Sequence, residues 1–128
     1  MKQAVKYQNI GLWVIQIGIG LLFAFSGAVK LFGSIQKLAE QIIWPGDVPF
    51  WLTRFIGISE VLGGIGLILP MALGIQKKLT SWAALGLLII ILLAAVFHLI
   101  RSEMAVIPMN LILAALCAVI IWKRGFKN

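Results

Sequence analysis

Residues 85–96 read LGLLIIILLAAV, a run without a single charged or hydrogen-bonding side chain. The run lacks the alternation of polar and apolar residues that is typical of a membrane barrel strand. In lipid, each segment must satisfy its own backbone hydrogen bonds, which a helix does and an open sheet does not. The surrounding segment extends from about Ser81 to Ile100, close to the roughly 20 residues that a helix needs to cross a bilayer core. It therefore predicts a transmembrane helix.

Three other segments have the same character. The chain of 128 residues is 62% hydrophobic and only 12% charged, whereas water-soluble proteins contain about 45–50% apolar residues. The length suits one domain, residues 1–128, and the mostly short connections favour antiparallel neighbours. We therefore predict an all-α integral membrane protein, an up-down bundle of four transmembrane helices at about residues 10–32, 50–73, 81–100 and 105–122.

The longest connection, residues 33–50, predicts a short amphipathic helix. Ser34 can cap it, and the turn residues Pro45-Gly46-Asp47 end it. Between them, apolar residues recur at helical spacing at Ile35, Leu38, Ile42 and Ile43. One interpretation is a helix lying on the outer membrane surface. The other is a lid over an opening between the spans.

The basic residues predict the orientation. The net charge is +7, and the segments before the first span, between spans two and three, and after the fourth span lie on one side. These segments contain no acidic residue and hold Lys2, Lys6, Lys77, Lys78, Lys123, Arg124 and Lys127. The positive-inside rule places that side in the cytoplasm. We expect a multi-pass protein of the cell membrane with cytoplasmic N- and C-termini, in contact with the lipid bilayer and not with nucleic acid. The first apolar run continues to Phe32, which disfavours a cleaved signal peptide.

One acidic residue lies deep in a predicted span. Glu60 follows Trp51 by nine residues, which places it about 13 Å into the membrane. Gly57 and Gly64 share its helix face, and glycine lets another helix approach closely. We therefore expect Glu60 to face the bundle interior. Lys30 is the expected partner, and Arg54 is the competing cation.

The other polar residues of the spans gather in the same outer half. They are Ser26 beside Lys30, His98 and Arg101 one turn apart, and Asn110 near the start of the fourth span. Buried polar groups of this kind mark functional sites in many membrane proteins. One interpretation is a polar pocket open to the outer side, and the other is a structural network that fixes the helix register. The candidate site is Ser26, Lys30, Arg54, Glu60, His98, Arg101 and Asn110.

Metal and thiol chemistry have little support in the sequence. Haem ligation by His98 alone is disfavoured, because the sequence has no second histidine. The single cysteine, Cys117, favours a role in packing over a reactive thiol. The pattern of the stripe Gln16, Gly20, Phe23 and Gly27 favours a helix-packing face over a ligand groove.

An ordered set of short motifs resembles the DoxX-like family of four-helix membrane proteins. The motifs are residues 25–32 (FSGAVKLF), 57–63 (GISEVLG), 66–70 (GLILP) and 95–98 (AVFH), together with Arg101 and Asn110. The resemblance implies a link to membrane redox systems, since the family name comes from a subunit of a thiosulfate:quinone oxidoreductase. It also implies redox proteins on the outer face as partners. The chain has no cysteine pair to perform dithiol chemistry by itself.

Three functions remain open. The first is a subunit or accessory of a quinone-linked redox system, whose polar pocket binds a quinone-like ligand. The second is a non-catalytic membrane scaffold or chaperone-like protein, in which the polar network only holds the bundle together. The third is a small transporter, which needs a homo-oligomer because four helices leave little room for a pathway. The sequence contains no independent catalytic motif, so enzyme activity of the isolated chain is left open.

Overall fold

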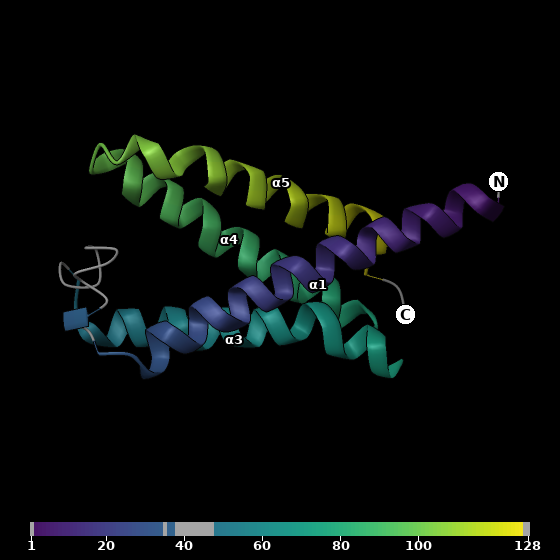
Figure 1. Ribbon diagram of the computed structural model, residues 1–128, viewed down its shortest axis with the longest axis horizontal. Helices are drawn as coiled ribbons and strands as arrows, with labels where there is room; N and C mark the ends of the chain where they lie inside the picture. The colour runs from purple at the N-terminus through teal and green to yellow at the C-terminus, as the bar shows by residue number, and fades with distance from the viewer. Residues whose placement is uncertain (1, 35, 38–47, 127–128) are drawn as a thin grey trace.

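The computed structural model describes residues 2–34, 36–37 and 48–126 (Figure 1). In this part of the chain the long helices are α1 (Lys2–Phe32), α3 (Phe50–Leu73), α4 (Lys78–Ile100) and α5 (Ile107–Arg124), and a short 3-10 helix, η2 (Met104–Val106), precedes α5. Four segments of these helices are long and apolar enough to cross a membrane. The predicted fold class, an all-helical protein with four membrane spans, is confirmed.

The helix boundaries differ from the predicted spans mainly at the chain ends, and α4 also begins at Lys78 rather than Ser81. The second span coincides with α3, whereas α1 begins at Lys2 rather than near residue 10, and α5 continues to Arg124. Hydropathy marks only the part of a helix that lies in lipid, while its backbone hydrogen bonds continue to form in water. The predicted amphipathic helix falls mainly on residues 38–47, which lie outside the described residues.

The helices alternate in direction along the bundle. In Figure 1 the two chain ends and the turn between α3 and α4 lie on the right, and the turn between α4 and α5 lies on the left. We call the first end, which carries Asn9 and Arg124, the terminal end. We call the opposite end, which carries Lys30 and His98, the Lys30 end. The bundle consists of two close pairs, α1 with α3 and α4 with α5, joined mainly through α3 and α4.

Glycines bring α1 and α3 into backbone contact. A Cβ atom on Gly27 would lie 2.5 Å from the Gly57 carbonyl oxygen, and one on Gly57 would lie 2.8 Å from the Gly27 oxygen. Two turns further along, Gly20 and Gly64 form a second contact of the same kind. Small residues allow this approach in membranes, where van der Waals packing drives helix association. Three residues of the predicted packing face of α1, Gln16, Gly20 and Gly27, thus contact α3, whereas Phe23 lies in the buried core.

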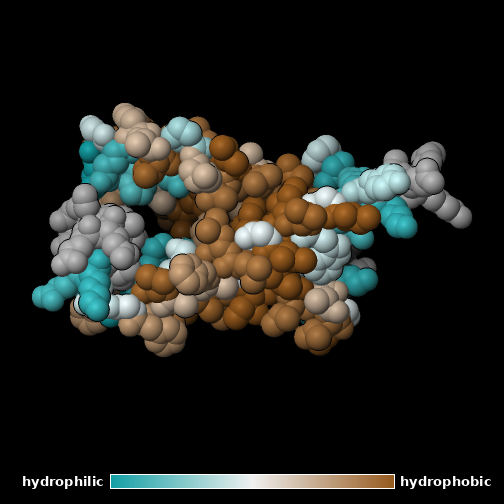
Figure 2. Space-filling view, viewed as in Figure 1, coloured by the Kyte–Doolittle hydropathy of each residue, from teal (hydrophilic) through white to brown (hydrophobic). Residues whose placement is uncertain are grey.

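A compact core fills the terminal half of the bundle. Leu67, Leu87, Cys117 and Ile120 are at most 1% exposed. Gly63 of α3 makes room for Leu87 of α4. Outside this core the helices present apolar side chains to the surroundings, and Figure 2 shows a hydrophobic band with hydrophilic residues at both ends of the molecule. That distribution suits a bilayer around the middle of the bundle.

We predict that Gly27→Ala separates α1 from α3 and destabilises the protein. The new methyl group meets backbone atoms of Gly57 and Val61, which cannot move aside as a flexible side chain would. Overpacking of this kind costs about 1–3 kcal/mol. Equilibrium unfolding in mixed detergent micelles measures the loss. Gly18→Ala is the matched control on the same helix, because nothing lies within 4 Å of its Cβ position. Equal stability of the two variants would contradict the proposed role of the glycine contact.

Candidate functional site

A cavity of about 610 Å³ lies between the helices toward the Lys30 end. Side chains from α1, α3, α4 and α5 line it, and most of them are apolar. The space-filling view shows the surface hollowed at this end, on the left (Figure 2). The polar side chains in its lining are Ser26, Lys30, Glu60, His98 and Asn110.

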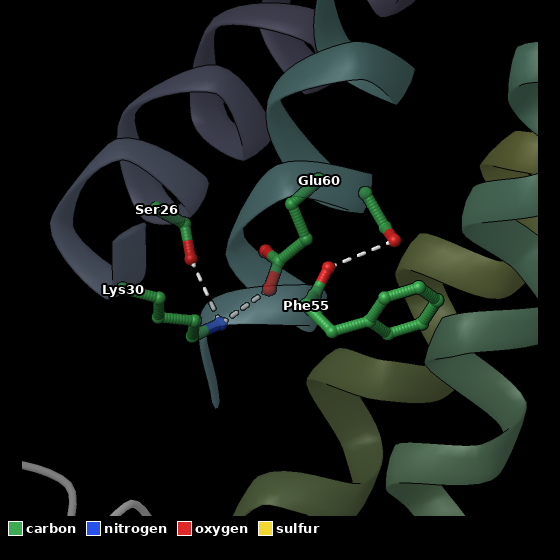
Figure 3. Close-up of polar contacts among 5 residues, drawn as sticks. Ser26, Lys30, Phe55 and Glu60 are labelled. Carbon is green, nitrogen blue, oxygen red and sulfur yellow. Dashed lines mark hydrogen bonds and ion pairs between the residues drawn. The ribbon is translucent and has the colours of Figure 1, made fainter. Parts of the chain in front are cut away.

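An ion pair between α1 and α3 forms one polar wall of the cavity. The Lys30 Nζ atom donates to Glu60 Oε1 at 2.6 Å and to Ser26 Oγ at 3.1 Å, and Figure 3 shows the ammonium group between the two acceptors. The Glu60 side chain is 3% exposed and that of Lys30 is 15% exposed. Each charged residue follows a glycine of the helix contact by three positions, Gly27 on α1 and Gly57 on α3. The backbone contact therefore brings the two charges within reach of each other.

His98 and Asn110 face the cavity from α4 and α5. The His98 Nδ1 atom lies 2.9 Å from Glu103 Oε1, and this contact fixes the ring from the turn that follows α4. The Asn110 Nδ2 atom is buried and has no hydrogen-bond partner among the described residues. Such a donor normally finds an acceptor in a folded protein. Asn110 therefore contributes an unused hydrogen-bond donor to the cavity lining.

The structure places the two arginines of the predicted pocket outside the cavity lining. Arg54 Nη1 donates to the carbonyl oxygens of Lys30, Leu31 and Gly33 at 2.7–2.9 Å. These are carbonyls at the C-terminal end of α1, which helical hydrogen bonding leaves unsatisfied. Arg101 Nε binds Glu103 at 3.1 Å, and its guanidinium lies 5.1 Å from the centre of the Phe97 ring. These contacts hold both guanidinium groups in place, which explains why neither extends into the cavity.

The cavity has the chemistry of an amphipathic binding site. Its walls are mainly Leu, Ile, Phe and Ala side chains, and its polar groups include a carboxylate, an ammonium, an imidazole and an amide. A mostly apolar pocket with a few placed polar groups is the usual form of a small-molecule site. Among the residues that the structure describes, no group of three or more His, Cys, Asp or Glu side chains is arranged to hold a metal ion.

A second polar network lies at the terminal end and was not predicted. Arg124 Nε donates to Gln16 Oε1 and Arg124 Nη1 to Asn9 Oδ1, both at 2.6 Å, and Gln16 Nε2 donates to the Leu67 carbonyl oxygen at 2.8 Å. We call Asn9, Gln16 and Arg124 the terminal clasp, because they join α5 to α1. The available signal was Gln16, an amide within an apolar span, since a polar group in lipid needs a partner.

We predict that breaking the Lys30–Glu60 pair costs more than removing it. Lys30→Met or Glu60→Leu alone leaves one buried charge without its partner, which in soluble proteins costs about 3–5 kcal/mol. The double variant leaves neither charge and should be more stable than either single variant. Equilibrium unfolding of the four proteins of this double-mutant cycle measures the coupling. Additive losses would contradict the interaction.

We further predict that Arg124→Ala loosens the terminal end. The change leaves the buried Gln16 oxygen without its donor, at a cost of about 1–3 kcal/mol. Lys123→Ala is the matched control, since it removes the same charge from an exposed neighbour that lies over Trp122. Thermal unfolding in detergent compares the two variants. A smaller loss for Arg124→Ala than for Lys123→Ala would contradict the role of the clasp.

Comparison with known proteins agrees with the motifs of the sequence. No curated protein and no solved structure matches the chain. A family model described as DoxX-like family matches residues 14–120, a range that includes the five polar residues of the cavity and both arginines. The match covers most of the 128 residues. This four-helix membrane protein therefore belongs to the DoxX-like family.

Proposed function

We propose that the protein is an accessory subunit of a quinone-linked membrane redox system and that its cavity binds a quinone-like molecule. The observation that carries the proposal is the cavity of about 610 Å³, whose apolar walls enclose the Lys30–Glu60 pair, His98 and Asn110. This volume lies within the roughly 300–1,000 Å³ typical of small-molecule sites. A quinone has complementary chemistry, with a polar head that bears two carbonyl oxygens and an apolar tail.

Asn110 is the proposed anchor for the head. Its Nδ2 atom is a buried donor without an acceptor among the described residues. Leaving such a donor unsatisfied costs about 1–3 kcal/mol, and a ligand carbonyl oxygen offsets that cost. His98 lies in the same lining and offers a ring nitrogen to the second polar edge of the ligand. Together the two side chains orient the head.

Glu60 and His98 are the proposed proton-holding groups. A bound quinone supplies two-electron redox chemistry, and its reduction takes up two electrons and two protons. Glu60 is nearly completely buried in the cavity wall, and His98 is linked to Glu103 in the turn after α4. A carboxylate and an imidazole placed in this way pass protons between the cavity and the aqueous side of that turn. We propose that a redox protein on the outer face exchanges the electrons.

The proposed orientation puts the Lys30 end outside the cell. The N-terminal end of α1, the C-terminal end of α5 and the turn between α3 and α4 lie together at the terminal end (Figure 1). These segments contain the described basic residues on which the positive-inside prediction rests. We therefore propose a protein of the cell membrane with cytoplasmic termini and a cavity in the outer half of the bilayer.

A scaffold function is the alternative that the structure also supports. Arg54 bonds to three carbonyl oxygens of α1, and Lys30 bonds to Glu60, so the polar groups hold α1 on α3. A transporter has less support, because the lining ends at Phe23 and Ile91, which belong to the buried core that fills the terminal half of the bundle. The two remaining candidates differ in whether a small molecule is bound.

Native mass spectrometry with absorbance spectroscopy tests the proposal on protein purified in mild detergent. We expect a retained quinone-like molecule, lost in Glu60→Gln and in His98→Ala. Ser59→Ala is the matched control, because Ser59 adjoins Glu60 but bonds to the Phe55 carbonyl oxygen of its own helix. If Glu60→Gln yields too little protein to analyse, loss of the ligand in His98→Ala alone tests the proposal. A well-folded, ligand-free protein that also fails to bind an added decyl-benzoquinone would favour the scaffold.

A further inference from the structure

The cavity meets the lipid-facing surface of the bundle at two places. Leu22 of α1 and Met109 of α5 line the cavity and are 49% and 57% exposed. Phe55 of α3 and Leu93 of α4 likewise line it and are exposed. A side chain that borders a cavity and also faces the surroundings marks an opening of that cavity. In a membrane, both openings face hydrocarbon rather than water.

The first opening lies between α1 and α5, two helices that pack loosely against each other. These two pack against each other less closely than the other neighbouring long helices of the described structure. The hydrogen bonds that the structure shows between their described residues are those of the terminal clasp, Arg124 with Gln16 and Asn9. From that contact on the right of Figure 1, α1 and α5 diverge toward the left, where the cavity lies.

The second opening lies between α3 and α4, which pack more closely against each other than α1 and α5 do. Glycine contacts hold these helices together, with Gly63 against Leu87 and Gly66 against Ala83. Two phenylalanines, Phe55 and Phe97, lie in the lining contributed by α3 and α4. Aromatic rings are large and stiff. The α1–α5 opening has instead an unbranched methionine, which adapts its shape to a neighbour.

Polar groups lie directly behind the α1–α5 opening. Ser26 follows Leu22 by one helical turn, and Asn110 follows Met109 in the chain; both side chains line the cavity. A molecule whose head binds at Asn110 therefore lies beside the opening that Met109 and Leu22 border.

We infer that the ligand is a membrane-dissolved molecule with a long apolar chain, which enters between α1 and α5 and leaves its chain in that opening. The inference rests on the proposed function, because it requires that the cavity binds the head. It adds the route of entry and the position of the apolar chain. A head group without a chain has no apolar surface to place between Leu22 and Met109.

Photolabelling of the intact protein in liposomes tests the route. The probe is a benzoquinone with a decyl chain that carries a diazirine at its far end, dissolved in the lipid. Peptide mapping after irradiation is expected to place the label on α1 and α5 near Leu22 and Met109. Excess decyl-benzoquinone should remove the label, and the Leu22→Trp/Met109→Trp variant should lose it. The control Val14→Trp/Ile112→Trp, at exposed positions of the same helices outside the lining, should keep it.

The possible outcomes distinguish a wrong route of entry from a failure of the cavity to bind the quinone. Competable label on α3 and α4 near Phe55 and Leu93 would overturn the proposed route and leave binding in the cavity intact. Label elsewhere in the protein that decyl-benzoquinone displaces would likewise overturn the route and leave binding intact. Equal labelling of the two tryptophan variants would have the same meaning. Failure of decyl-benzoquinone to compete at all would contradict the proposed function and the inference with it. If the tryptophan variants do not fold, the positions labelled on the unmodified protein still decide between the two openings.

Discussion

The backbone contact between α1 and α3 is the constraint on which the site depends. Gly27 and Gly57 bring the helices so close that a Cβ atom on either would overlap the other backbone. Three positions further along each helix are Lys30 and Glu60, whose charged atoms then lie 2.6 Å apart. In a low-dielectric interior a charge is tolerated only with a close partner. Larger side chains in place of the glycines would separate the charges and leave each of them buried alone.

Among the described residues, the four long helices pack together at the terminal end and separate into two pairs at the Lys30 end. In the terminal half, Gly63 of α3 admits Leu87, and the terminal clasp joins α5 to α1. At the Lys30 end, Arg54 ties α3 to the last carbonyl oxygens of α1, which strengthens that pair but adds nothing across the bundle. The α4–α5 pair therefore separates from the α1–α3 pair toward this end (Figure 1). The cavity lies in the space between the two pairs.

The sequence predicted part of the candidate site. It placed Glu60 in the interior with Lys30 as partner, because two glycines and a carboxylate on one face of a helix have few other arrangements in lipid. It also grouped His98 and Asn110 with this pair, and the structure brings all four to one cavity. It did not separate out Arg54 and Arg101, since a long side chain can turn toward an interior or away from it. It assigned Arg124 only to orientation, although its guanidinium binds Gln16.

The sequence by itself determined the number of spans, their approximate limits and the class of fold, because the transfer of apolar side chains into lipid depends on composition along the chain. Its motifs also indicated the DoxX-like family. The tertiary structure alone decided which polar groups share a cavity, where α1 and α5 separate, and which charges are bound to the backbone. These features depend on the rotation of each helix about its axis and on contacts between residues as distant as Gln16 and Arg124. Hydropathy changes little when a helix turns about its axis, whereas a hydrogen bond of 2.6 Å exists in only one such arrangement.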